Sequence, residues 1–336
     1  MFRHTLVTLL LSCGVFSSPV FGEDLKMNVG FQPGTAPRFF VARDQNMFKK
    51  AGLDAKFTRF TAGPAMLAAL KGEDIDIAFM TTAPAVFGLS QGLDLKVFFI
   101  ESDAAATQAL VSTKAAAIKS LSDQKGRRIG VTFGTSAHYA LLKSLQEANL
   151  SAQSVQILDM QPTAMIPAFI KGDIDGAWSW DPWTAKMESE GGHIVGSLET
   201  MHLPMAGVWV ARGRWLAANQ EATQRFIKAM DQTTALLKTN EKAATASISE
   251  ALGVEAADAS RIYKRIEIPP VSAQLQGYIA SLGTSATRRN SGMAKHMGDL
   301  ADFFYSEKRI PVRPDVEGAV EPGPVEKYLA KNRGEM

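Results

Sequence analysis

The sequence predicts an α/β fold made of two similar lobes, each with a mixed, mostly parallel sheet flanked by helices. Short apolar runs alternate with segments of helical length along residues 27–211, an order that favours parallel strands joined by helices. One sequence pattern also occurs twice, at residues 65–76 and 164–175. The 336 residues suffice for two lobes that each bury a core, so we expect one α/β unit to be built twice.

The strand candidates are short runs rich in β-branched and aromatic residues. We expect strands at Met27–Phe31, Ala55–Phe60, Ile75–Met80, Leu95–Ile100, Ala109–Ser112, Arg128–Phe133, Val155–Met160, Ile174–Trp180 and Val208–Ala211. We expect helices at Pro37–Lys50, Pro64–Lys71, Ala83–Gln91, Ser136–Ala148, Thr163–Lys171 and Pro182–Glu190. After residue 220 the pattern becomes almost wholly helical, with segments near 220–239, 241–251, 256–264, 289–307 and 324–331.

The repeated pattern is a helix that ends at Lys-Gly and a strand that starts with Asp-Ile-Asp. It reads Ala-Met-Leu-Ala-Ala-Leu-Lys-Gly-Glu-Asp-Ile-Asp at 65–76 and Ala-Met-Ile-Pro-Ala-Phe-Ile-Lys-Gly-Asp-Ile-Asp at 164–175. A glycine after the last helical lysine is a helix C-cap signal. A second pair, at 29–36 and 129–136, leads from a strand through Gly-Thr into a helix. Two ordered pairs indicate an internal duplication.

The N-terminus is typical of a secretory signal peptide. Arg3 and His4 precede a short apolar run at 5–16, and small residues follow. We expect residues 1–22 to be removed by cleavage after Gly22, with lipidation of Cys13 as the alternative. Because no later segment has a long uncharged apolar run, we expect the body of the protein to be periplasmic.

Composition argues against nucleic-acid binding and against an enzyme. Lys+Arg number 36 and Asp+Glu 34, so the net charge of +2 creates no strong field for nucleic acid. The five histidines lack metal-ligand spacing, and the only cysteine lies in the export segment. No Gly-x-Ser-x-Gly, Walker or His-Glu-x-x-His motif occurs. We therefore expect no catalytic residues, no metal and no cofactor.

A ligand is expected where the strands end and the helices begin. Ligands of open parallel sheets bind beyond the carboxyl ends of the strands, and helix N-termini favour anions. The four junctions of this kind are 32–36, 81–84, 134–136 and 181–182. Thr82 and Ser136 can either cap a helix or donate their hydroxyls to an oxyanion. Since the repeat gives each lobe an equivalent pair, we expect the lobes to grip a small anion between them.

Three other residues lie beside these junctions. Trp180 ends a strand and either belongs to the core with Trp178 or walls a pocket for a short alkyl group. Asp181 either caps the helix that starts at Pro182 or binds a cation. His138 lies one helical turn after the 134–136 loop, where its N–H can donate to an anion if it is not structural.

The sequence resembles the taurine/alkanesulfonate/nitrate family of ABC-transporter binding proteins, most closely its taurine-type members. The stretches that carry the resemblance are Gly63-Pro64, Leu70-Lys71-Gly72, Asp76-Ile77-Ala78, Gly134 to Leu142, Gln161-Pro162, Lys171 to Ala177, Trp180-Asp181-Pro182 and Val208-Trp209-Val210. The resemblance implies a two-lobed periplasmic-binding-protein-like fold of type II, with the ligand cleft between the lobes. We expect one lobe at 23–113 plus 213–336, with the C-terminal helices, and the other at 114–212. The implied partners are a small sulfonate, a membrane permease and an ATPase, and we expect a monomer.

By matched position the resemblance also implies a ligand-binding set. Residues that fall where the family holds the sulfonate or its neighbours are Gln32, Thr82, Thr135, Ser136 and His138, with Trp180 on the pocket wall. Taurine-type members tend to carry an aspartate for the substrate's ammonium where this chain has Gly207, and Asp181 is the candidate substitute. The alternatives are another ligand, such as nitrate, a thiamine precursor or an aromatic carboxylate, or an enzyme resembling the pyrimidine-precursor synthases for thiamine.

Overall fold

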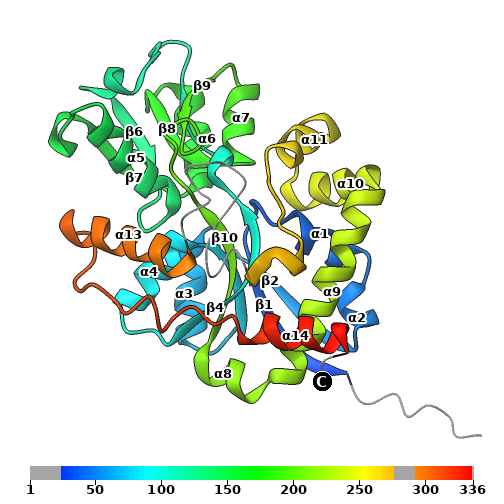
Figure 1. The fold of residues 1–336 in the computed structure, drawn as a ribbon. Coiled ribbons are helices and arrows are strands. Elements are labelled where there is room, and N and C mark those ends of the chain that lie inside the picture. Colours follow the sequence, from blue (N-terminus) through cyan, green and yellow to red (C-terminus); the bar gives the residue numbers. More distant parts are fainter. Residues whose placement is uncertain (1–23, 276–291, 335–336) are drawn as a thin grey trace, which may run out of the picture.

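Two five-stranded sheets, each covered by helices, form the computed structural model (Figure 1). The structure describes residues 24–275 and 292–334. The predicted signal peptide, its cleavage after Gly22 and the alternative lipidation at Cys13 lie outside the described residues. The lobe of the first sheet carries the C-terminal helices, and the lobe of the second sheet lies above it in the view of Figure 1.

The first sheet has the strand order β2-β1-β3-β10-β4. Its strands are β1 Leu25–Phe31, β2 Leu53–Arg59, β3 Ile77–Thr81, β4 Leu95–Asp103 and β10 Ala206–Arg212. Strand β1 runs parallel to both β2 and β3, whereas β10 runs antiparallel to β3 and β4. The sheet is therefore mixed, with its three parallel strands drawn from the first copy of the repeat.

The second sheet, ordered β7-β6-β8-β5-β9, has the same arrangement. Its strands are β5 Gln108–Ser112, β6 Arg128–Val131, β7 Gln156–Asp159, β8 Gly176–Trp180 and β9 His193–Ser197. Strand β6 is parallel to β7 and β8, and β5 is antiparallel to β8 and β9. The predicted internal duplication is confirmed by this match. The edge strand β9 was not predicted, because its short His-Ile-Val-Gly-Ser run has little alternation.

The chain passes between the lobes twice, and each passage delivers the antiparallel strand of the sheet that it enters. It leaves the first sheet after β4 to form β5, and it returns after β9 to form β10. The two passages lie side by side, since the Ala104 N–H donates to the Met205 carbonyl at 2.7 Å. If each lobe is taken as one sheet with its helices, the expected limits at 113/114 and 212/213 both move earlier by one strand.

Most helices lie close to the predicted positions, but the short helix at 213–218 was not predicted. The helices are α1 Pro37–Asp44, α2 Met47–Lys50, α3 Gly63–Lys71, α4 Thr82–Ser90, α5 Ser136–Glu147, α6 Pro162–Lys171, α7 Trp183–Ser189, α8 Gly213–Ala218, α9 Gln220–Thr239, α10 Glu241–Leu252, α11 Ala256–Lys264, α13 Met293–Ser306 and α14 Gly323–Arg333. The helix expected at 37–50 is interrupted at Asn46, whose φ of 54° is left-handed and cannot continue a right-handed helix.

The repeated Asp-Ile-Asp motif has the same structural task in both lobes. Asp76 accepts a hydrogen bond from the backbone N–H of Asn28 at 2.8 Å, and Asp175 accepts one from that of Arg128 at 2.8 Å. Each carboxylate thereby ties one parallel strand to the segment that leads into its neighbour. The motif therefore has a structural role in both copies.

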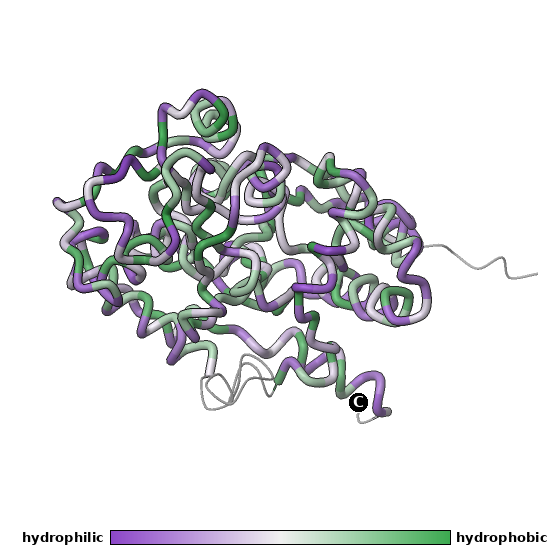
Figure 2. The backbone as a smooth tube through the Cα atoms, turned by 90° about the horizontal axis from the view of Figure 1, so that it is seen from above, coloured by the Kyte–Doolittle hydropathy of each residue, from purple (hydrophilic) through white to green (hydrophobic). Residues whose placement is uncertain are grey.

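One apolar core cluster extends through both lobes, and two smaller clusters lie beside it in the described residues. Trp209 on β10 packs between Phe39 and Phe226, with ring centroids 5.1 and 5.0 Å away. Figure 2 shows that hydrophobic segments gather in the interior and hydrophilic segments lie on the outer turns. Within 24–275 and 292–334, no helix combines the length and the apolar character needed to cross a membrane.

Candidate functional site

The predicted junctions lie where the two lobes meet. Helices α4 and α5, which start after β3 and β6, contact each other across the lobes. A second contact joins the β1–α1 turn to the end of β8, where the Trp180 indole N–H donates to the Pro33 carbonyl at 3.0 Å. A third joins Thr61 to Gln161, whose side-chain oxygens are 3.3 Å apart. The carboxyl ends of the parallel strands therefore face one another between the lobes.

The β1–α1 turn carries Gln32, whose side chain is 7% exposed. Its Oε1 is buried and, among the residues that the structure describes, accepts no hydrogen bond. A buried amide oxygen without a partner costs free energy, and a simple sulfonate cannot satisfy it because it carries no N–H or O–H donor. Gln32 thus lies where the lobes meet, and its ligand-binding role stays a prediction.

A backbone N–H group at the start of α1 already donates to a carboxylate of the chain itself. Glu101 on β4 accepts the N–H of Phe39 at 3.3 Å and the indole N–H of Trp209 at 3.0 Å. A register shift in the β10–β4 pairing, between Gly207 and Val208, leaves Glu101 unpaired in the ladder. Burial raises the pKa of Glu101, while the Arg38 guanidinium lowers it. The first of the four junctions is therefore a poor site for another anion.

Thr82 is the first residue of α4 and not its N-cap, which is Thr81. Its fully buried hydroxyl lies 2.7 Å from the Nε2 atom of His296 on α13 and 3.4 Å from the Sδ atom of Met205. The capping interpretation of Thr82 is thus wrong. The hydroxyl is held from two other segments of the chain.

The start of α5 presents neutral hydroxyl groups. Thr135 is the N-cap, since its Oγ1 accepts the backbone N–H of His138 at 3.4 Å and donates to the Thr132 carbonyl at 2.6 Å. Ser136, only 3% exposed, donates to Oε1 of Gln108 at 2.6 Å. Thr135 and not Ser136 is therefore the cap. The first N–H groups of a helix have no intrahelical partner, and these remain the anion-binding feature of α5.

His138 is a buried, neutral histidine. Its ring stacks on Phe133, with centroids 4.5 Å apart and planes inclined by 14°. Burial, together with the nearby charge of Arg309, lowers the pKa of His138 to about 4. Its Nε2 atom is buried with no partner among the described residues. A neutral imidazole can donate one N–H, as the sequence predicts, but it adds no positive charge.

Trp180 and Asp181 both lie at the lobe contact, where they have structural partners. Trp180 is 3% exposed and belongs to the core cluster, although its N–H reaches the other lobe. Asp181 accepts hydrogen bonds from the Thr184 hydroxyl and, at 3.4 Å, from Nη1 of Arg265. Helix α7 starts at Trp183 with Pro182 as N-cap, so Asp181 is not the N-cap that the sequence suggests. With both oxygens engaged, it is also a poor partner for a ligand cation.

A family model described as the NMT1-like family matches residues 22–253. The chain belongs to the NMT1-like family. Its match with the taurine-binding periplasmic protein of Escherichia coli (strain K12) is 29% identical over 208 residues, which are 61% of this chain and 64% of that protein. The matched part is therefore less than two thirds of that relative. The predicted resemblance to taurine- and alkanesulfonate-binding proteins is confirmed.

Solved structures match this NMT1-like chain over nearly its whole length. An alkanesulfonate-binding protein from Xanthomonas axonopodis pv. citri, bound to MOPS, has a TM-score of 0.75 and 22% identity, covering 90% of this chain and 100% of that one. A desulfurization enzyme has a TM-score of 0.65 and 14% identity, covering 92% and 100%. The predicted two-lobed periplasmic-binding-protein fold is confirmed. Because the same fold also hosts an enzyme, the function must be argued from the site.

Sequence reasoning missed several residues of the site of this NMT1-like protein. Gln108, Glu101, His296 and Arg265 all contact predicted site residues or neighbouring backbone from positions distant in sequence. None lies in a repeated motif or at a junction that the sequence singles out. Only the fold could bring them to the site. Within the described part of the chain, no cluster of three or more His, Cys, Asp or Glu side chains could hold a metal ion.

Proposed function

We propose that this protein is the substrate-binding component of an ABC importer and holds a small sulfonate between its two lobes. The observation that carries the proposal is the contact between α4 and α5, each from a different lobe, with Thr82 and Ser136 buried at their starts. Oxyanions are favoured at helix N-termini, and closing the lobes would strengthen each charge-assisted hydrogen bond by excluding water. The taurine-binding relative and the alkanesulfonate-binding structure support a sulfonate as the ligand class.

The charges around the site favour a simple alkanesulfonate over taurine. Taurine's ammonium needs a carboxylate, yet Asp181 already pairs with Arg265 and Glu101 lies beside Arg38. At Gly207, an added Cβ would lie 2.6 Å from Oγ of Ser102 and 3.1 Å from the Phe79 ring, so a side chain would need these neighbours to shift. Among the described residues, no carboxylate with free oxygens therefore stands at these positions.

The proposal includes the partners and the location of the protein. We propose that the chain is exported by residues 1–22 and presents its closed form to a membrane permease that is coupled to an ATPase. Closing around a ligand is a hinge motion, and the paired passages near Ala104 and Met205 are suited to it. An enzymatic role is disfavoured because Cys13 is the only cysteine, which leaves residues 23–336 without a thiol nucleophile.

Calorimetric titration of purified residues 23–336 tests the ligand class. We expect heat of binding with ethanesulfonate, a weaker signal with taurine, and none with nitrate or sulfate at equal concentration. Ser136→Ala is expected to weaken ethanesulfonate binding, because the Ser136 proton is donated to a side chain, that of Gln108, and can turn to an oxyanion, unlike the Thr135 proton, which a backbone carbonyl holds. Lys143→Ala, on the same helix beyond the first turn, serves as the matched control. Absence of binding to every sulfonate would contradict the proposal, and stronger binding of taurine than of ethanesulfonate would contradict the preferred ligand.

A further inference from the structure

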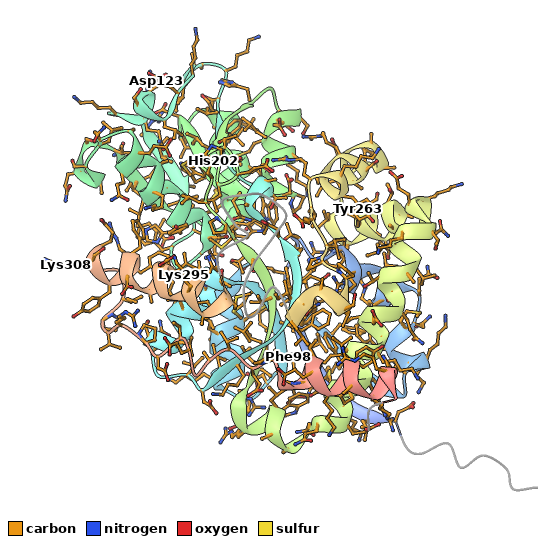
Figure 3. All side chains as sticks on the ribbon, in the orientation of Figure 1. Phe98, Asp123, His202, Tyr263, Lys295 and Lys308 are labelled. Carbon is orange, nitrogen blue, oxygen red and sulfur yellow. The ribbon has the colours of Figure 1, made fainter. Side chains whose placement is uncertain are left out.

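A hydrogen bond between α13 and the start of α4 involves two buried polar side chains. His296 is 4% exposed and Thr82 fully buried, and their Nε2 and Oγ1 atoms are 2.7 Å apart. Helix α13 packs on α4, and Figure 3 labels Lys295, the residue before His296, on that helix. The Lys295 side chain is 63% exposed, so the helix turns its charge outward and its imidazole inward.

A threonine hydroxyl has one proton and can donate only one strong hydrogen bond. If the Nε2 atom of His296 carries no proton, Thr82 must donate to it and turns only lone pairs toward a ligand, which repels an anion. If Nε2 carries the proton, it donates to Oγ1 and the Thr82 proton is released. The neighbouring acceptor in the structure is then the Sδ atom of Met205 at 3.4 Å. A thioether is a weak acceptor, so an oxyanion would displace it readily.

The imidazole of His296 is neutral at pH 7, which makes the choice of tautomer decisive. Burial lowers the pKa of His296 to about 4, with Asp299 acting to raise it and Lys295 to lower it. A neutral imidazole has one N–H, and the position of that proton is set by its surroundings. A hydrogen-bond chain that ends on an anion is polarised along its length, which strengthens each bond in it.

We propose that His296 is a positioning residue for the ligand: its Nε2–H donates to Thr82, and this directs the Thr82 hydroxyl proton toward a sulfonate oxygen. The proposal rests on the proposed function, because it assigns Thr82 to the bound anion. The proposal adds His296, which is 214 positions after Thr82 in the sequence, to the ligand-binding residues at the helix starts of the two lobes. The imidazole acts through Thr82 and does not itself touch the ligand.

The tautomer is measured first, in ligand-free protein with ¹⁵N-labelled histidine. Nitrogen chemical shifts distinguish Nε2–H from Nδ1–H, and we expect the Nε2–H form for His296, assigned by its loss in His296→Gln. The Nδ1–H form, either free or with ethanesulfonate bound, would overturn the proposal. This measurement needs no ligand. If the protein bound no sulfonate, the proposed function would be contradicted, but the tautomer of His296 would still be determined.

Titration with ethanesulfonate then tests whether His296 acts through Thr82. His296→Ala and Thr82→Val are each expected to weaken binding by about 10- to 100-fold, the range for a hydrogen bond to a charged group. His296→Gln, whose amide can donate to Oγ1, is expected to restore most of the affinity. The double variant should bind no more weakly than Thr82→Val alone, because both changes remove one chain of hydrogen bonds.

Additive losses in the double variant, or equal losses in His296→Gln and His296→Ala, would show that His296 supports the site only by packing. Thermal unfolding of each variant separates these results from misfolding. Lys295→Ala is the matched control, since Lys295 precedes His296 on α13 and its side chain is 63% exposed. Its affinity is expected to remain within about three-fold of the native protein, because the hydrogen bond between His296 and Thr82 is retained.

Discussion

The starts of α1 and α5 follow equivalent strands in the two lobes, yet they are satisfied by different chemistry. At α1, the N-cap Ala36 has no side-chain hydrogen bond, and the Glu101 carboxylate accepts an N–H of the first turn. At α5, the neutral hydroxyl of Thr135 is the cap. One helix start therefore faces a carboxylate of its own chain, whereas the other faces neutral groups and retains its attraction for an external anion.

This difference shows that the two copies of the repeat share their backbone geometry but differ in the charged groups around their helix starts. Both copies direct a strand into a helix at the lobe contact, but a carboxylate at one copy changes what that helix start can bind. The α7 start likewise lies next to Asp181, which Arg265 and Thr184 hold. Of the four predicted junctions, those at Thr82 and at Ser136 are left as the better pair for a ligand anion.

Removal of the Glu101 carboxylate tests the difference between the two helix starts, and its expected effect is the largest. Glu101→Ala leaves the Arg38 guanidinium buried without its neighbouring carboxylate, and burial already lowers the pKa of Arg38. The free energy of unfolding is expected to fall by about 3–5 kcal/mol, the usual cost of a buried charge that loses its partner. Urea unfolding followed by tryptophan fluorescence measures the loss.

The double variant Arg38→Met/Glu101→Leu is the control for this prediction. Because it removes both charges, its destabilisation is expected to be smaller than the sum of the two single changes. A strictly additive result would show that the two groups do not interact. A Glu101→Ala protein as stable as the native one would mean that the α1 start does not depend on its internal anion.

The buried histidines test whether the two lobes respond alike to acid. Burial lowers the pKa values of His138, on α5, and of His296, on α13 beside α4, to about 4 each. Unfolding restores values near 6.5, so the unfolded chain binds more protons between about pH 6.5 and 4. The stability that each neutral histidine provides is present above pH 6.5 and is lost as the pH falls toward 4, by up to about 3 kcal/mol each.

Urea unfolding at several pH values between 7 and 4 checks this prediction with His138→Gln and His296→Gln. Each variant is expected to flatten the pH dependence by a similar amount, because each removes one buried titrating group. The raised pKa values of Glu101 and Asp181 act in the opposite direction, so only the difference from the native protein is informative. An unchanged slope in either variant would contradict the burial argument for that histidine.

The backbone arrangement was largely predictable from the sequence because local patterns determine it. Strands, helices and the duplication all follow from apolar runs, turn residues and a repeated motif, which act over short distances. The strand β9 was missed because an edge strand needs only one partner and shows little pattern. The break at Asn46 was missed because a single left-handed residue leaves no periodic signal.

The chemistry of the site was less predictable because its partners come from distant parts of the chain. The sequence identifies Thr82 as a hydroxyl at a helix start, but nothing near it indicates His296. Similarly, the sequence suggests that Asp181 caps a helix, whereas the structure shows Arg265 beside it. Propensity rules assign a residue to an element, whereas the role of a polar side chain depends on which other side chains the fold brings within hydrogen-bond distance.

The cap of α5 gives the smallest expected effect, and it separates capping from ligand binding at that helix. The Thr135 hydroxyl already donates to the Thr132 carbonyl and accepts from His138, so its proton is not free for an anion. Thr135→Ala is expected to lower the free energy of unfolding by about 1 kcal/mol. Ala36→Ser, at the equivalent start of α1, is expected to add no stability because Glu101 already accepts an N–H of that turn.

If Thr135 only caps, its loss should change the ethanesulfonate dissociation constant by less than about three-fold in calorimetric titration, whereas Thr82→Val should change it by about 10-fold or more. Equal losses for the two threonines would return Thr135 to the ligand-binding set and make both helix starts direct partners of the anion.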